Sequence, residues 1–589
     1  MRALFRAFPA LALLSAPLAL PAQTAPPAPF GERVDVNIVN VEVYVTDKDG
    51  NPVDGLGRGD FEVREDGKPV PIANFQSVRG ASPSPSVPAR PAGDTAAGAD
   101  RSAAPDPLHL VVYVQNTFLV PSHRNRVLQQ LRDFLSQLPP EAEVMLATED
   151  PDLRIRQPFT RDRAALARAV DAVEALGASG TSNLSARKQA LDQILTIRDV
   201  NSSKWINEPC LSEIAQPAHA YANAARGDVL RALGAMTVLV NSLSGLPGRK
   251  ALLLVSDGMP VTPGEEVFQV LGEICNPSGT SGNKDVEIGG NGPLSGVYDA
   301  RQAALDAQQY SAANAFKDLA AHANAQRVTI YGLQASGLEG NASAGADWGV
   351  NERLQQLPSV QTVAISNLQG SMTSLASDTG GRAILNANDL RHDFDRMQED
   401  FSTYYSLAYT PPHNGDGRDH RIEVRLKRSG LHARYRQSYR DKPPLERMVD
   451  RTLASLFYGV EDNPLEIEMK AGAMAPVDGQ SWMVPVRLRI PLFKITMLPT
   501  DKTFEGKVRL LVATRGPSGK RPPLRQAEVP ISIPKEKVLT ALGQYYVYEV
   551  KLTLGPGEQH IAVAVRDEMT AATSYLAQTL RIDPLEGKK

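Results

Sequence analysis

The residues of this chain that could do chemistry are few and widely separated. Asp257 follows an apolar run in "LVSDGM", which matches only part of the Gly-x-Ser-x-Gly turn that presents a nucleophilic serine. Asp378 stands in a single "SDTGG" stretch, whereas chemistry by paired carboxylates needs a second copy, and a helix ending at Gly380–Gly381 explains the motif equally well. His123 lies beside Arg124, which predicts a solvated helix face. With neither a His-Glu-x-x-His motif nor a phosphate-binding loop, we expect a protein that is not an enzyme.

Length, composition and charge restrict the class of protein. A chain of 589 residues is too long for a single hydrophobic core and predicts about two to four domains. The hydrophobic content of 42% and the charged content of 22% are those of an ordinary globular protein. The formal net charge of −3 and the absence of dense basic runs argue against nucleic acid as a partner.

The first residues indicate export. "MRALFRAFPALALLSAPLALPAQ" has two arginines, then an apolar run, then small residues, which is typical of a signal peptide over residues 1–22. No later apolar run approaches the ~20 residues that a transmembrane helix needs. We therefore expect a secreted or periplasmic protein without a transmembrane segment.

The chain has two cysteines, Cys210 and Cys275. In an oxidising compartment an even pair predicts a disulfide, and the alternative is two separate buried thiols. A bridge between them would join two irregular inserts, near residues 199–220 and 276–296.

The hydrophobic pattern predicts a multidomain protein, with an α/β doubly wound domain between two β-rich modules. From residue 108, short apolar strands such as "LHLVVYV" and "KALLLVS" alternate with amphipathic stretches, as in a parallel sheet covered by helices. Before and after this region, alternating strands are separated by turn signals. The expected boundaries are an N-terminal β module at 31–80, a Pro/Ala/Ser-rich disordered linker at 81–107, the α/β domain at 108–440, a helical connector at 441–460 and a β-sandwich at 461–589.

Several stretches together resemble a known family. The strand–loop–helix that begins at Leu108, "SGTSN" at 179–183 and "GRKALLLVSDG" at 248–258 resemble a von Willebrand factor A domain. More narrowly, "VTDKDGNPVDGLGRGDFEVREDGKPVPI", "LASDTGGRAIL" and "DFSTYYSLAYTP" are similar to the VWFA-related family described from Acidobacteria. The likeness covers roughly residues 33–440, so the C-terminal module lies outside it.

This resemblance implies a metal-ion-dependent adhesion site at the carboxyl ends of the strands. Family logic uses Asp-x-Ser-x-Ser in the first loop, a Thr in the second and an Asp in the third. The matching positions here are Gln115, Thr117 and Leu119, then Thr181, then Asp257. Thr117, Thr181 and Asp257 fit the pattern, although hydrogen bonding within loops would explain the threonines, and a helix cap or turn would explain Asp257.

The departures from the pattern weaken the expected site. Mg²⁺ and Mn²⁺ prefer oxygen ligands, and carboxylates offset the cost of removing water from the ion. Gln115 lacks the charge of Asp, and Leu119 offers no oxygen, although Glu149 and Asp150 follow a neighbouring strand. We expect a degenerate site with weak or absent metal binding and no other cofactor.

The functional hypothesis is a non-enzymatic module that binds a protein or glycan at the loop face around Asp257. One alternative is a structural envelope or assembly component whose β modules make the contacts. A hydrolase ranks third, because no nucleophile–base pair is visible.

Overall fold

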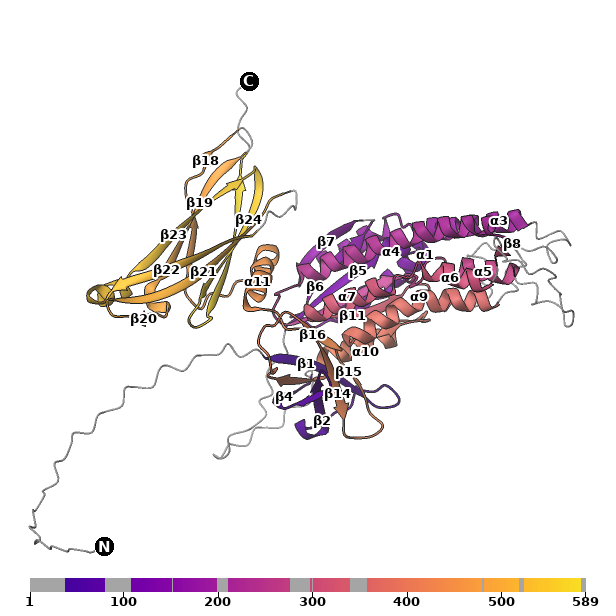
Figure 1. Cartoon of the computed structure of the whole chain (residues 1–589), viewed down its shortest axis with the longest axis horizontal. Helices are drawn as coiled ribbons and strands as arrows, with labels where there is room; N and C mark the ends of the chain where they lie inside the picture. Colours follow the sequence, from indigo (N-terminus) through magenta and orange to yellow (C-terminus); the bar gives the residue numbers. More distant parts are fainter. Residues whose placement is uncertain are drawn as a thin grey trace, which may run out of the picture. The chain divides into compact units, whose positions relative to one another are not determined.

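The computed structural model describes residues 38–79, 107–150, 152–198, 210–275, 297–298, 300–338, 358–478, 481–517 and 524–583. These residues form a central α/β domain, a small β domain and a C-terminal pair of sheets (Figure 1). The expected mixed α/β multidomain architecture is confirmed. The predicted signal peptide, the linker up to residue 106, the second insert and half of the first insert lie outside the described residues. No helix among the described residues is both long and apolar enough to cross a membrane.

The central domain is built on one sheet of six strands in the order β12-β11-β9-β5-β6-β7. Its strands are parallel, except that β7 runs antiparallel to β6 at the edge. Every residue of β5 and β9 is buried, because helices cover both faces. The strands are β5 (Leu108–Gln115), β6 (Glu143–Glu149), β7 (Leu153–Thr160), β9 (Arg249–Ser256), β11 (Val328–Gln334) and β12 (Ala383–Ile384).

Two groups of helices enclose this sheet. Alternate residues of β5 point to opposite faces, so Leu110 packs with one group and Val111 with the other. The first group is α1 (Pro121–Gln137), α2 (Arg163–Glu174) and α10 (Arg391–Ser402), and the second is α4 (Gln216–Ser242), α7 (Ala313–Ala325) and α9 (Pro358–Thr379). This arrangement is doubly wound, as the alternation of apolar strands and helices predicts.

The small β domain differs from the sequence prediction, which placed residues 31–80 in a separate module and residues 404–440 in the α/β domain. Strand β13 instead lies between β1 and β4, and β14 pairs with β2. The apolar side chains of the strands within residues 39–78 pack against those of the strands within residues 404–440. The two segments therefore form one shared core, and neither forms it alone. The strands are β1 (Val39–Thr46), β2 (Phe61–Glu65), β3 (Lys68–Val70), β4 (Ile72–Val78), β13 (Tyr404–Tyr409), β14 (Asp419–Leu426), β15 (His432–Arg434) and β16 (Ser438–Arg440).

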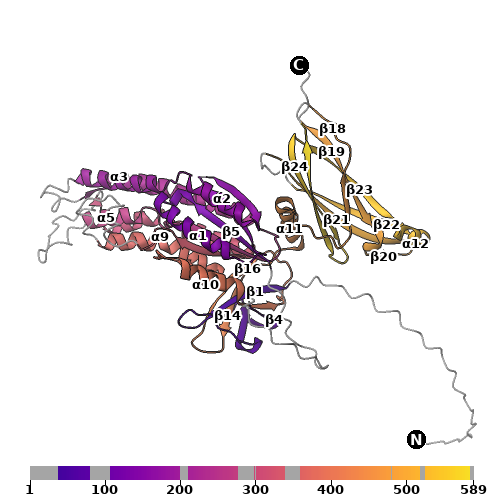
Figure 2. The same ribbon diagram turned by 180° about the vertical axis from the view of Figure 1, so that it is seen from behind.

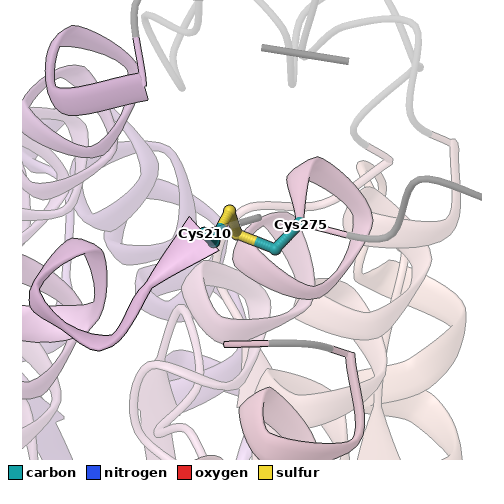
Figure 3. Close-up of a disulfide and its surroundings, with 2 residues drawn as sticks. All are labelled: Cys210 and Cys275. Carbon is teal, nitrogen blue, oxygen red and sulfur yellow. A yellow bond between two sulfur atoms is a disulfide. The ribbon is translucent and has the colours of Figure 1, made fainter. Parts of the chain in front are cut away.

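A helical extension continues past the edge of the central sheet in both views of the chain (Figures 1 and 2). It has its own core, to which the amino-terminal half of α4 contributes. The predicted disulfide Cys210–Cys275 is confirmed and joins β8 to the end of α5 inside this core (Figure 3). The other elements are α3 (Gly180–Arg198), β8 (Cys210–Leu211), α5 (Glu265–Ile274), β10 (Val297–Tyr298) and α6 (Ala300–Gln308).

The C-terminal region consists of two antiparallel sheets around one apolar core. Helix α11 (Pro444–Tyr458), in the expected connector, packs on the outer face of one sheet through residues such as Met448 and Leu456. The remaining elements are β17 (Glu468–Ala471), β18 (Ala475–Pro476), β19 (Trp482–Pro491), β20 (Leu498–Pro499), β21 (Thr503–Arg515), β22 (Arg525–Pro534), α12 (Val538–Leu542), β23 (Tyr545–Leu554), β24 (Gly557–Asp567) and β25 (Thr573–Ile582).

Replacing both bridged cysteines by alanine tests what the disulfide does. We expect Cys210→Ala/Cys275→Ala to lower the stability of the helical extension by about 2–4 kcal/mol, because the bridge closes a long loop of chain. Hydrogen exchange should quicken in α3, α5 and α6 and stay unchanged in β21 and β24, which serve as the internal control. Unaltered exchange in the extension would contradict a stabilising role for the bridge.

Candidate functional site

The loops at the carboxyl ends of β5, β9 and β11 meet under the helical extension and enclose a cavity of about 170 Å³. Helices α3, α4, α5 and α9 provide most of its walls. Gln334 at the end of β11, Asp257 directly after β9 and His123 on α1 complete the lining. This is the edge at which open α/β sheets bind ligands.

Asp257, directly after β9, is held by the first turn of α1. Its Oδ2 atom accepts a hydrogen bond of 2.9 Å from the backbone N–H of Val120 and lies 3.1 Å from Nδ1 of His123. Both side chains of the Asp257–His123 pair are 15% exposed. A carboxylate is favoured at the start of a helix, where unpaired N–H groups and the helix dipole attract negative charge. The charge of Asp257 is therefore partly compensated by the protein itself.

Gln115, at the end of β5, is fully buried, and its Nε2 lies 3.1 Å from Sδ of Met259. Thr117 donates a hydrogen bond of 2.7 Å to Oε1 of Glu149, at the end of the neighbouring strand β6. Burial raises the pKa of Glu149, although the bond from Thr117 opposes this shift. Leu119 is buried in the core on the α1 side of the sheet. The three residues that the sequence analysis assigned to the first loop thus contact different neighbours, and their side chains do not converge on one position for an ion.

The second predicted loop lies at the start of α3. Gly180 packs so tightly against the first loop that a Cβ there would lie 2.4 Å from the carbonyl carbon of Leu119. Asn183 donates a hydrogen bond of 2.9 Å to the backbone oxygen of Thr117. Thr181 itself is exposed and does not line the cavity. The structure therefore brings Asp257 and Asn183 to the cavity and places Thr181 outside it.

The prediction of a solvated face at His123 and Arg124 is wrong. Arg124 is only 1% exposed, and its guanidinium donates to the backbone oxygens of Glu174 and Leu176 at 2.9 and 2.8 Å. These carbonyls lie at the C-terminal end of α2, where a cation is favoured. The same guanidinium donates to Oδ1 of Asn116 at 3.1 Å, which fixes the loop after β5 against α2.

The donors at this edge fit a divalent cation only in part. Three oxygens, Gln115 Oε1, Glu149 Oε2 and Asp257 Oδ1, are buried and have no hydrogen-bond partner within the described part of the chain, which is what a cation would use. Two features oppose cation binding. His123, which can become positively charged, lies beside Asp257, and Leu119 supplies no oxygen. Among the described residues, no group of three or more His, Cys, Asp or Glu close enough to share an ion includes Asp257.

Sequence reasoning missed two sets of residues. The first lines the cavity from the helices: Arg187 on α3, Asp228 on α4 and Glu266 on α5. Burial raises the pKa of Glu266, and the nearby Arg187 opposes the shift. No sequence pattern marks these residues, because each comes from a different helix. The second set surrounds His413 and His420 in the small β domain, and the spacing of "HNGDGRDH" could have indicated it.

The strand order and the loops gathered at the carboxyl edge are those of a doubly wound α/β domain. No family model matches the sequence, and no curated protein matches it. Among solved structures, the chain is similar to a von Willebrand factor type A protein from Catenulispora acidiphila, with 9% identity and a TM-score of 0.21 over 82% of this chain and 67% of that one. It is also similar to the vWF domain of the type V pili tip protein Mfa5 from Porphyromonas gingivalis, with 14% identity and a TM-score of 0.22 over 50% and 95%.

A third similarity is to β-glucuronidase 2 of Bacteroides uniformis, with 7% identity and a TM-score of 0.14. It covers 20% of this chain and only 13% of that enzyme. Likenesses at these levels carry no argument about activity or ligand.

Restoring the missing carboxylate tests the metal chemistry of this edge. We expect Gln115→Asp to gain Mg²⁺ and Mn²⁺ binding, seen by calorimetry and as a rise in Tm, because a second carboxylate offsets the dehydration of the ion. The wild type should show little or no change with either ion. Gln115→Asn is the matched control, since it alters the side chain without adding charge.

The double variant Gln115→Asp/Asp257→Ala should lose the gained binding. Strong metal binding by the wild type that Asp257→Ala abolishes would contradict the expectation and show that the amide of Gln115 serves as a ligand.

Proposed function

We propose that this protein is a non-enzymatic binding module, secreted or periplasmic, that recognises a protein partner at the cavity beside Asp257 without requiring a metal. The observation that carries the proposal is the position of Asp257 in the lining of a partly open cavity, where Val120 and His123 hold it. A free oxygen of this carboxylate, Oδ1, is buried and without a hydrogen-bond partner in the described chain. A ligand that donates to it would satisfy a group that is otherwise costly to bury.

The size of the cavity supports a protein partner over a free small molecule. Sites for drug-sized ligands enclose roughly 300–1,000 Å³, whereas this cavity encloses about 170 Å³. That volume suits one side chain or one polar group of a larger partner. The helices of the extension surround the cavity, so they would form the surrounding contact surface.

The charges around the cavity favour a cationic side chain. Asp228, Asp257 and Glu266 provide carboxyl groups, whereas Arg187 is the permanent cation of the lining. His123 carries a charge only when protonated. With His123 neutral the lining has an excess of acidic groups, which attracts a lysine or arginine and disfavours an acidic residue.

Selection from a random-peptide display library with the purified full-length protein tests this proposal. We expect enriched peptides to share one lysine or arginine, and their affinity to fall at least about tenfold in Asp257→Asn, because a charge-assisted hydrogen bond contributes about 1.5–3 kcal/mol. Asp501→Asn is the matched control, since it removes the same charge from an exposed position in the C-terminal region.

Two outcomes would overturn the proposal. Peptides that bind Asp257→Asn as well as the wild type would place recognition elsewhere. Failure of the selection together with binding to a glycan array would replace the protein partner by a carbohydrate, and failure of both would favour an assembly role for the β domains.

A further inference from the structure

A second cluster of ionisable side chains lies in the small β domain, apart from the cavity. Two imidazoles, His413 and His420, stack face to face with their ring centres 3.8 Å apart and their planes at 16°. Four carboxyl groups contact them. These belong to Glu65 at the end of β2, Asp66 in the turn after it, Asp416 in the loop before β14 and Asp441 after β16.

The hydrogen bonds give each ring the same arrangement. Nδ1 of His413 lies 2.7 Å from Oδ2 of Asp441, and Nδ1 of His420 lies 2.8 Å from Oδ2 of Asp66. A carboxylate at Nδ1 holds a proton on that atom. A cation would take the lone pair of each Nε2 in place of a proton shared with the carboxylate there. Each Nε2 already lies beside a further carboxylate, at 2.7 Å from Glu65 for His413 and at 3.2 Å from Asp416 for His420.

We infer that this cluster is a Zn²⁺ site, with Glu65, His413 and His420 as ligands and the fourth position open to Asp416, which lies beside His420. Atoms of the first three residues all lie within 4.8 Å of one another. A tetrahedral zinc with bonds of about 2.0 Å separates its ligand atoms by about 3.3 Å. This separation falls between the 2.7 Å of the His413–Glu65 contact and the 4.8 Å limit. Because the two rings are stacked, one of them must rotate out of the stack before both face a single ion.

The residues around the ligands support a built site. Tyr439 donates a hydrogen bond of 2.9 Å to the second oxygen of Glu65, and the backbone N–H of Gly415 donates to Asp441 at 2.5 Å. Asp441 is fully buried and Glu65 is 4% exposed. Metal-ligating histidines usually donate their other N–H to a carboxylate or carbonyl, and ligating carboxylates are themselves hydrogen-bonded. Both features are present here.

The chemistry of the donors selects zinc over harder cations. Imidazole nitrogen suits Zn²⁺, Cu²⁺ and Ni²⁺, whereas Mg²⁺ and Ca²⁺ take oxygen ligands. Without a metal, two protonated rings would supply two positive charges to this cluster, and they would lie stacked against each other. A single divalent ion supplies the same two charges while both rings remain neutral.

The proposed ion would join two parts of the chain that are far apart in sequence. His413 and Glu65 are separated by 348 positions, and the strands they flank form the same sheet through the β14–β2 pairing. Zinc would therefore stabilise the small β domain at the junction of its early and late segments, as structural zinc sites do elsewhere.

Protons are the competing occupants, and pH distinguishes them from zinc. Burial lowers the pKa of His413, but hydrogen bonds to Asp441 and Glu65 outweigh it and raise the pKa above its ordinary value. A histidine whose pKa is raised on folding gives stability that is complete below about pH 6.5 and is lost as the pH rises through the folded value. Zinc binding has the opposite dependence, because its ligands must be deprotonated.

The test uses the full-length protein stripped with a chelator and then titrated with Zn²⁺. We expect one bound equivalent by calorimetry and elemental analysis, a higher Tm whose increment grows from pH 6 to pH 8, and a tetrahedral absorption spectrum when Co²⁺ replaces Zn²⁺. Asp66→Asn should weaken binding by about 10–100-fold, because it alters only the partner of a ligand. His413→Gln/His420→Gln should abolish binding.

Controls separate this site from misfolding and from the cavity. His432→Gln changes an exposed histidine of the same domain and should leave zinc binding intact. Asp257→Asn should also leave it intact, since the inference does not depend on the proposed function. Circular dichroism checks that each variant folds, and Asp66→Asn keeps the test informative if the double-histidine variant does not. The inference is overturned if the folded wild type takes up no Zn²⁺, or if the folded double-histidine variant binds it equally well.

Discussion

The burial of β5 and β9 on both faces is the constraint on which the rest of the α/β domain depends. Every residue of these two strands is buried, so apolar side chains occupy their interior positions and polar side chains stand at their ends. His109, Arg249 and Lys250 lie at the amino ends. Gln115 and Ser256 end the strands, and Asp257 is the next residue of the chain. A buried parallel sheet thereby collects polar groups at the ends of its strands, where each needs a partner from another element.

Those partners come from helix termini. The start of α1 supplies Val120 N–H and His123 to Asp257, while the C-terminal carbonyls of α2 receive the guanidinium of Arg124. Opposite ends of two helices thus bind opposite charges, as their dipoles favour. Both contacts fix the same loop, so the orientation of Asp257 follows from helix packing and does not require an ion. The helical extension then closes the edge into a cavity.

The sequence predicted the parts of this architecture that follow from local pattern. Apolar runs of strand length identified the central sheet, Asp257 stood at the end of one of them, and an even pair of cysteines in a chain expected to be exported predicted their pairing. The pairing of β13 with β1 was missed because it depends on register between distant segments, each of which could have joined another sheet. Arg124 was missed because an arginine near the start of a helix is normally solvated, and only the position of α2 buries it. The residues lining the cavity come from helices separated in sequence, so their convergence exists only in the fold.

The two ionisable sites differ in how their charge is balanced, and this difference follows from their surroundings. At the sheet edge, one imidazole and a helix N-terminus face Asp257, and the remaining donors are oxygens that would suit a hard cation only with more negative charge. In the small β domain four carboxylates surround two imidazoles contributed by a loop and a strand. The balancing charge there must come from protons or from an ion that accepts nitrogen ligands. Gln115 therefore adds no negative charge at the first site, where His123 and the helix N-terminus face Asp257, whereas the second site holds carboxylates that two neutral rings cannot balance.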